Sequence, residues 1–478
     1  MQQPNFLMIV ADQHRADALG AAGKLPIHTP NLDELCARGA RFENAFTPLP
    51  VCAPARQAML CGQNPDSYGA FWNYGFFDAA SLEPEPYWPE QLRRAGYQTA
   101  FFGKWGASQH HGACEFGYEQ YTGFDGWQKR VQQLYPNRTV PDWFGGRSDL
   151  PLADSKTHWL AAQAADTIRS FTASGQPWHI RIDYTDPHLP CEVSEPFYSM
   201  YADQELPPWG GANDPLEGKP YMHRQQLLNW GLEDMTWQDW LPCVRHYYGM
   251  VSQIDDSIGL LLEALRESGA LEQTIILYTS DHGDTCGSRG MLDKHYILYD
   301  DVVRVPLIVA GPGIQQGIVP DALVSAGLDL PPTIDEWFGV TSPDAQGRSF
   351  VPLLQGQQPA DWRTQITASS NGQQFGFFNQ RMLRDHHYKY IWNMTDIDEL
   401  YNLDEDPDEK VNRISWPDEQ ARICRMRRNL YDCLKAQGDL FYRAAGWIAS
   451  CWRIKRVRAD QPGTKTTEHD KKITREWT

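Results

Sequence analysis

The segment Cys52-Ala53-Pro54-Ala55-Arg56 is the part of the sequence best suited to carry chemistry. A proline two residues after the cysteine suits the first turn of a helix, and helix-favouring residues continue from there to Gly62. The sequence therefore predicts a helix that begins near Cys52, where free backbone N–H groups and the helix dipole favour an anion. Arg56 lies one turn further on the same face. The pattern predicts a reactive sulfur site, and an ordinary buried cysteine before a helix is the alternative.

Metal-ligating residues follow two apolar segments that predict buried strands. Asp12 and Gln13 come after the first of these segments, and Asp281 and His282 come after the other. In an open α/β sheet, ligands bind beyond the carboxyl ends of the parallel strands. We therefore expect these four residues and Cys52 to converge on one divalent cation. For each residue taken singly, a helix cap or a loop position is the alternative.

The elements that must position these residues alternate along the first two-thirds of the chain. Strands are expected over 6–10, 97–102, 179–184, 274–279 and 305–310, and helices over 31–38, 155–171 and 247–265. This order predicts an α/β fold with a mostly parallel sheet covered by helices on both faces.

The pattern changes after about residue 355, where strand candidates follow one another at 376–378, 380–383 and 388–392, before a helix over 421–434. The sequence therefore predicts a catalytic domain over 1–355 and a smaller α+β subdomain over 356–478 that contains an antiparallel sheet. The segment from Cys451 onward has eight basic and four acidic residues, so the subdomain is expected to end in a basic tail.

Composition excludes several classes of protein. The 478 residues carry a net charge of −18, which argues against a nucleic-acid-binding protein. No apolar run is long enough for a transmembrane helix, so no membrane partner is expected. The N-terminal segment lacks the basic region of a signal peptide, and the ten cysteines form no Cys-x-x-Cys pair. These features favour a cytoplasmic protein with reduced thiols.

The chain resembles the type I sulfatases of the alkaline phosphatase superfamily over nearly its whole length. Besides the 52–56 signature, the resemblance rests on blocks in the family's order at 4–13, 29–33, 96–100, 103–105, 186–190, 280–284, 294, 304–307 and 400–403. The resemblance implies an alkaline-phosphatase-like fold for the large domain. It also implies that a maturation enzyme oxidises Cys52 to formylglycine.

The resemblance further implies a mechanism for sulfate ester hydrolysis. A hydroxyl of the hydrated formylglycine attacks sulfur, and the second hydroxyl then allows the covalent sulfate to leave by elimination. Arg56, Lys104 and Lys294 supply positive charge, and His188 protonates the leaving oxygen, together with Lys294. The implied metal ligands are Asp12, Gln13, residue 52, Asp281 and His282.

Three positions depart from the common pattern of the family. Many relatives have aspartate where this chain has Gln13, and asparagine where it has His282. Fewer carboxylates and one imidazole make the site less purely hard, so Mn²⁺ becomes the alternative, while Ca²⁺ remains the expected ion. Relatives usually have histidine in place of Gly106, where it is thought to assist elimination, so His110, His111 or another base must take that role here.

The substrate is expected to be a small carbohydrate sulfate rather than a simple aryl sulfate. The residues expected to bind it are Trp105, His110, Asp284, Arg289 and His295, with a structural ion pair as the alternative for Asp284 and Arg289. A second copy of the chain is a further possible partner. The rival functions are a phosphonate monoester hydrolase or phosphodiesterase, and an inactive sulfatase-fold binding protein, which only Gly106 supports. Hydrolysis by an unmodified Cys52 thiol ranks last.

Overall fold

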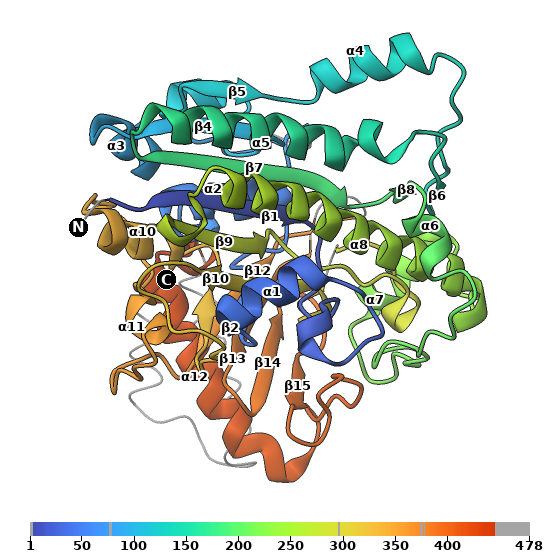
Figure 1. Cartoon of the computed structure of the whole chain (residues 1–478). Coiled ribbons are helices and arrows are strands. Elements are labelled where there is room, and N and C mark those ends of the chain that lie inside the picture. The colour runs from blue at the N-terminus through green and yellow to red at the C-terminus, as the bar shows by residue number, and fades with distance from the viewer. Residues whose placement is uncertain (1–2, 76–78, 295–296, 373–375, 377, 445–478) are drawn as a thin grey trace.

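The protein is described by a computed structural model that covers residues 3–75, 79–294, 297–372, 376 and 378–444 (Figure 1). The strands are β1 (Asn5–Asp12), β2 (Gly39–Phe42), β3 (Ala45–Phe46), β4 (Gln98–Gly103), β5 (Gln120–Thr122), β6 (Gly146–Arg147), β7 (Trp178–Pro187), β8 (Glu192–Val193), β9 (Thr274–Ser280), β10 (Leu307–Ala310), β11 (Val324–Ser325), β12 (Ile366–Ser370), β13 (Gln380–Arg384), β14 (Tyr388–Asn393) and β15 (Glu399–Asn402).

The helices of the described residues cover both faces of a central sheet and one face of a smaller sheet (Figure 1). They are α1 (Pro30–Arg38), α2 (Cys52–Cys61), α3 (Trp88–Arg94), α4 (Asp125–Leu134), α5 (Lys156–Ser174), α6 (Phe197–Met200), α7 (Tyr221–Trp230), α8 (Trp237–Glu267), α9 (Asp300–Val303), α10 (Leu330–Phe338), α11 (Val351–Leu354), α12 (Gln420–Gln437) and α13 (Leu440–Ala444).

The central sheet has the strand order β2-β10-β9-β1-β7-β4-β5. β1 pairs in parallel with both β7 and β9, while β10 runs antiparallel to its neighbours β9 and β2. The prediction of a mostly parallel α/β sheet is therefore confirmed. Because β1 lies between β7 and β9, the residues that follow these strands meet at one edge of the sheet.

Side chains of β1 alternate between the two faces of the central sheet, as the pleat of a strand requires. Leu7, Ile9 and Ala11 pack in the core with residues of α1, α5 and α8. Phe6, Met8 and Val10 point to the opposite face, where α2, α3 and α10 supply the apolar partners. Both faces are covered, which explains why this strand is apolar along almost its whole length.

The smaller sheet has the order β12-β13-β14-β15 and is antiparallel throughout, as the sequence predicts. One face of the sheet packs against α12, through contacts such as Leu383 with Leu430. The other face packs on the larger unit, where Met382 and Tyr401 share a core with Phe46. The small sheet is therefore packed against β3 and the segment that follows β9.

One predicted strand is wrong. Gly376 and Phe378 lie outside the strands, and residue 377 lies outside the described residues. Gly372 and Gly376 have φ angles of 60° and 150°, so the backbone turns here instead of extending. The sequence analysis missed β12 (Ile366–Ser370), which pairs with β13.

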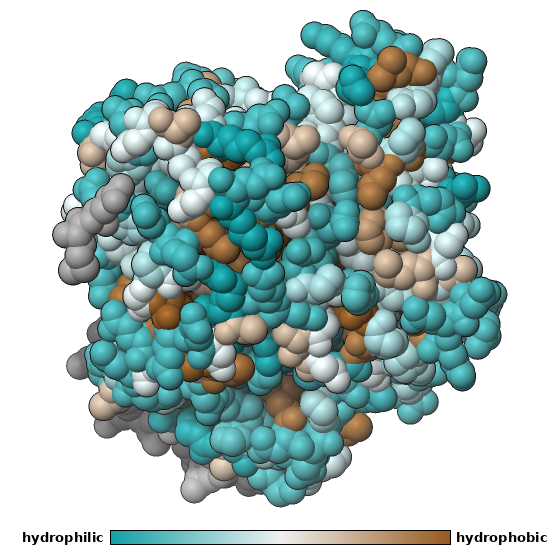
Figure 2. All heavy atoms as spheres, in the orientation of Figure 1, coloured by the Kyte–Doolittle hydropathy of each residue, from teal (hydrophilic) through white to brown (hydrophobic). Residues whose placement is uncertain are grey.

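The face drawn in Figure 2 is mainly hydrophilic, with apolar side chains scattered over it. Among the described residues, no helix is both long and apolar enough to cross a lipid bilayer. The nine cysteines in the described part of the chain are all free thiols, while Cys451 and the basic tail lie outside it.

Three buried histidines predict that the fold loses stability in mild acid. Burial lowers the pKa of His14 to about 4 and that of His179 and His223 to about 3, against an ordinary value of 6.5. Below pH 6.5 these histidines take up protons in the unfolded chain but not in the folded chain, so each lowers the free energy of unfolding.

We therefore expect the thermal unfolding midpoint to decrease as the pH is lowered from 6.5 to 5, with an opposing contribution from Asp255, whose pKa burial raises to about 7. Thermal melts followed by circular dichroism would measure the change. A midpoint that stays constant over this interval would contradict the prediction.

Candidate active site

Cys52 is the first residue of α2, as the sequence predicts. Val51 precedes the helix in an extended conformation, and Gly62 ends it with a φ of 71°, a left-handed conformation that glycine adopts without strain. Cys52 is buried, 3% exposed. Its sulfur therefore lies at the end of the helix where backbone N–H groups and the dipole favour negative charge.

Four residues bring potential metal ligands together at the carboxyl edge of the central sheet. Ligand atoms of Asp12, Cys52, Asp281 and His282 all lie within 4.8 Å of one another, and all four residues are buried. Asp12 ends β1, and Asp281 follows the adjacent strand β9, whose Ser280 pairs with Ala11. Parallel pairing of these strands is thus what brings the two carboxylates together.

Arg56 and Lys104 surround the carboxylates of this cluster with positive charge. Arg56 Nε donates to Asp281 Oδ2 at 3.0 Å, and its Nη2 lies 3.3 Å from Asp12 Oδ2. Lys104 donates to the same carboxylate oxygen of Asp12. Burial opposes ionisation of Asp12, but Lys104 and Arg56 outweigh it and hold the pKa of its carboxyl well below its usual range.

His282 presents Nε2 to the cluster, 3.3 Å from Cys52 Sγ and 3.7 Å from Asp281 Oδ1. Its Nδ1 lies 2.9 Å from the carbonyl oxygen of Gly283, which can only accept, so Nδ1 carries a proton. Burial lowers the pKa of His282, but Asp281 and Cys52 raise it more, to about 8. The cluster therefore favours a cation at this position and is compatible with a bound metal ion.

The surroundings of the Cys52 thiol lower its pKa and so favour the negatively charged thiolate. Burial and Asp12 raise its pKa, but Lys104, Lys294 and His282 together lower it below its ordinary value. Lys104 and Lys294 would also stabilise any other anion that binds at the first turn of α2.

Gln13, Lys294 and His188 form a chain of hydrogen bonds next to the cluster. Lys294 Nζ donates to Gln13 Oε1 at 3.1 Å and to His188 Nε2 at 2.8 Å. The Gln13 backbone N–H donates to Asp281 Oδ1 at 3.1 Å. Burial, followed by the charge of Lys294, lowers the pKa of His188 to about 4. His188 is therefore neutral at physiological pH, and Lys294 carries the proton that the pair shares.

Comparison with known proteins identifies the family. A family model described as Sulfatase matches residues 4–340, which is more than half of the chain. The chain belongs to the sulfatase family. A second model, described as N-sulphoglucosamine sulphohydrolase, C-terminal, matches residues 287–436. The expected sulfatase activity, hydrolysis of sulfuric esters, is confirmed by this membership and by the names of the relatives.

Individual relatives of this sulfatase are distant but span most of its length. It is 29% identical to a choline-sulfatase of Rhizobium meliloti, covering 87% of this chain and 83% of the relative. It is 24% identical to an N-acetylglucosamine-6-O-sulfatase of Bacteroides thetaiotaomicron, covering 86% of this chain and 82% of the relative.

A solved structure confirms the predicted fold class of this sulfatase. The phosphonate monoester hydrolase of Agrobacterium radiobacter superposes with a TM-score of 0.77 at 24% identity, covering 91% of this chain and 96% of that one. The alkaline-phosphatase-like fold, with its large parallel sheet and separate antiparallel sheet, is thus shown.

Gly106 of this sulfatase lies directly against Arg56. A Cβ atom added at Gly106 would lie 2.8 Å from Arg56 Cδ, so any other side chain would require Arg56 to shift. His111 has a carboxylate partner at each ring nitrogen. Its Nδ1 and Nε2 lie 2.7 Å from Glu115 and 3.0 Å from Glu83, and its carbonyl oxygen accepts from the indole of Trp105. His110 is exposed.

Most of the side chains expected to bind substrate have partners within the fold of this sulfatase. Trp105 packs edge-on against Phe101, with ring centroids 5.2 Å apart. Asp284 accepts from Gln13 Nε2 at 2.7 Å, and Arg289 is ion-paired with Asp301 and 3% exposed. His295 lies outside the described residues. A role of these side chains in substrate binding stays a prediction.

Two residues that contact the segment around Cys52 and Arg56 were not predicted from the sequence. Asn73 Oδ1 accepts from the Ala53 backbone N–H at 2.9 Å, and its Nδ2 lies 3.8 Å from Cys52 Sγ. Asp183 is fully buried in β7 and is ion-paired with Arg56. The available signal was the presence of Arg181 and Asp183 two residues apart in a buried strand, because a buried strand tolerates charges only when they are paired.

Replacing Asp183 by alanine should destabilise this sulfatase strongly. Its carboxylate pairs with the guanidinium groups of both Arg56 and Arg181, and all three side chains are buried. Removing it leaves the buried Arg181 without its carboxylate partner and takes one of three carboxylates from Arg56, for which we expect a loss of about 3–5 kcal/mol in the free energy of unfolding. Urea denaturation would measure it.

The exposed ion pair between Arg169 and Glu267 offers a matched control. Glu267→Ala should cost less than about 1 kcal/mol, because solvent screens exposed pairs. Equal losses in the two variants would contradict the prediction.

Proposed function

We propose that this chain hydrolyses a carbohydrate sulfate ester through a formylglycine formed at position 52 by a maturation enzyme, with a divalent metal ion held beside it. The observation that carries the proposal is the convergence of Asp12, Cys52, Asp281 and His282, whose ligand atoms lie within 4.8 Å of one another.

The donor set of this cluster fits a divalent metal ion. Asp12, Asp281 and His282 would hold the ion beside residue 52, and the Gln13 amide oxygen, which accepts from Lys294 in this structure, would be a further ligand. When bound, the ion supplies Lewis-acid activation of the nucleophile and of a sulfate oxygen. The two carboxylates favour Ca²⁺, while the imidazole makes Mn²⁺ the second choice.

The cationic side chains around position 52 would bind and orient the sulfate group. Lys104 and Lys294 are both near enough to lower the pKa of the Cys52 thiol, so both would stabilise charge on sulfate oxygens. Arg56 holds the carboxylates of Asp12 and Asp281 in place. Lys294 carries a proton at Nζ and shares it with His188 Nε2, so this pair would supply the proton that the leaving alcohol takes up.

A sugar substrate is supported by the family model over residues 287–436 and by the relative that is named for N-acetylglucosamine-6-O-sulfate chemistry. The choline-sulfatase has a similar sequence identity to this chain but is named for a different sulfate ester, so sequence identity alone does not specify the alcohol. We therefore propose a small sulfated sugar as the substrate class.

Phosphonate monoester hydrolysis is the second candidate function. It is favoured by the superposition on the Agrobacterium radiobacter enzyme.

Two measurements test the proposal. Peptide mass spectrometry of the segment around Cys52, from a host with maturation machinery, should show a loss of about 18 Da relative to the thiol form, or its hydrate. The values of kcat/KM should then be higher for sulfated monosaccharides than for aryl sulfates, phosphate diesters and phosphonate monoesters. An unmodified thiol in the native host would overturn the mechanism, and a higher value for a phosphonate monoester would favour the second candidate.

A further inference from the structure

A cavity lies where the large unit meets the C-terminal sheet, and the metal-ligating residues around Cys52 do not line it. It has a volume of about 370 Å³, and its walls come from the segment after β1, from residues 207–211, from α9 and from the C-terminal sheet. This volume lies within the range of small-ligand sites, on the order of 300–1,000 Å³.

Three half-buried carboxylates along this cavity, those of Asp17, Asp300 and Asp301, already have cationic partners. Arg15 pairs with Asp17 at 2.8 Å and with Asp301 at 2.7 Å, and Arg289 also pairs with Asp301. Asp300 pairs with Lys389 at 2.5 Å and with Arg384 at 3.2 Å. These charges are therefore compensated within the fold, as is that of Glu409, which pairs with Lys389 at 2.6 Å, while the exposed Asp408 carboxylate also borders the cavity.

Arg304 is a cation of these walls that is compensated only at longer range, because its charge lowers the pKa of the Asp17 and Asp300 carboxyls without a direct ion pair. Its Nε is buried without a hydrogen-bond partner, and no ion pair links its guanidinium to the described part of the chain. Arg384, which is 5% exposed, also lines the cavity and has a buried Nε without a partner. Leaving such donors unsatisfied is costly, and a bound anion would satisfy them.

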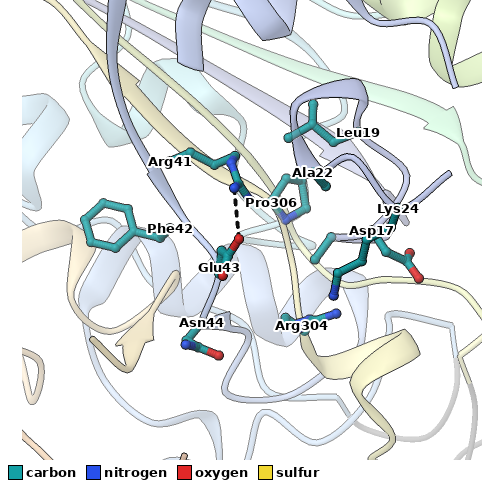
Figure 3. Close-up of a pocket in the computed structure, with 11 residues that line it drawn as sticks. Asp17, Leu19, Ala22, Lys24, Arg41, Phe42, Glu43, Asn44, Arg304 and Pro306 are labelled. Atoms are coloured by element: carbon teal, nitrogen blue, oxygen red, sulfur yellow. Dashed lines mark hydrogen bonds and ion pairs between the residues drawn. The ribbon is translucent and has the colours of Figure 1, made fainter. Parts of the chain in front are cut away.

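A smaller adjoining pocket of about 60 Å³ shares Arg304, Lys24 and Asp17 with this cavity. Figure 3 shows the Arg41–Glu43 ion pair on one side of the smaller pocket, and Arg304 with Lys24 on the other. Two cationic side chains therefore border the space that the two pockets share. Trp209 and neighbouring prolines supply apolar walls in the larger cavity, which would strengthen charge-assisted hydrogen bonds there.

We propose that this cavity is a second anion-binding site, in which Arg304, Arg384 and Lys24 bind a tetrahedral oxyanion such as inorganic sulfate or phosphate. The site is separate from the catalytic one and does not depend on conversion of Cys52. Its ligand would contact both the large unit and the C-terminal sheet, and would thereby stabilise their junction.

Equilibrium dialysis of the full chain with radiolabelled sulfate, and separately with phosphate, tests the proposal. Arg304→Gln should bind one anion fewer per chain than the wild type, or bind that anion about 10-fold or more weakly. Inhibition of ester hydrolysis by the same anion should be unchanged, because it reports on the catalytic site. The anion that the wild type binds more tightly identifies the ligand.

Arg41→Gln is the matched control, since it removes an arginine from the smaller pocket that Glu43 already neutralises. It should leave anion binding as in the wild type. Lys24→Ala, at an exposed position, should also weaken binding and serves if Arg304→Gln does not fold. Equal anion binding by the wild type, Arg304→Gln and Lys24→Ala would overturn the proposal, as would equal losses in Arg304→Gln and Arg41→Gln.

Discussion

Replacing Cys52 by alanine should lower kcat/KM for a sulfate ester by roughly 10³-fold or more, because it removes the residue from which the nucleophile is made. The cations around position 52 would remain in place, since Arg56 and Lys104 are bonded to carboxylates and not to the sulfur. The Cys52→Ala variant should therefore still bind inorganic sulfate with an affinity similar to that of the wild type. Steady-state kinetics on a matured preparation would measure the loss.

Cys61 provides the matched control for this substitution. It lies at the other end of α2, and burial raises its pKa to about 11, so it stays a neutral thiol. We expect Cys61→Ala to retain nearly full activity per folded molecule. Loss of activity in both variants would indicate that the integrity of α2, and not the chemistry of position 52, is what the substitution damages.

Removing divalent metal ions should lower activity by roughly 100-fold or more, and Asp281→Asn should raise the metal concentration needed for half-activation by a similar factor. Asp281 carries one of the two carboxylates in the cluster, and its Oδ1 lies 3.7 Å from His282 Nε2. Chelation followed by titration with Ca²⁺ or Mn²⁺ would measure both effects and rank the two ions.

A stability measurement gives a readout that does not depend on catalysis. A metal ion at 100 times its Kd should raise the free energy of unfolding of the wild type by about 2.7 kcal/mol, and less in Asp281→Asn. Asp335→Asn is the control, because this carboxylate bonds Ser342 beside α10 and lies outside the cluster. If a chelator changes neither the activity nor the free energy of unfolding, the site does not depend on a metal ion.

Local sequence patterns were enough to predict the main elements of the fold. The apolar run before Asp12 and the β-rich run before Asp281 form adjacent parallel strands, and the segment after Val51 forms a helix. The failure at 376–378 has a physical reason, because glycines with positive φ angles turn a segment whose composition resembles a strand.

The sequence by itself determined the family, the helix that begins at Cys52 and the group of Asp12, Asp281 and His282. These features depend on the spacing of residues within short segments and on the residue types that follow strands. Both can be read directly from the amino-acid sequence.

Only the tertiary structure decided what surrounds them. The contact of Asn73 with Ala53, the ion pair of Asp183 with Arg56 and the approach of Gly106 to Arg56 join residues that no local pattern links. The cavity at Arg304 likewise exists because two sheets meet there. Such contacts depend on strand order and on how the sheets pack, which the spacing of residues along the chain does not specify.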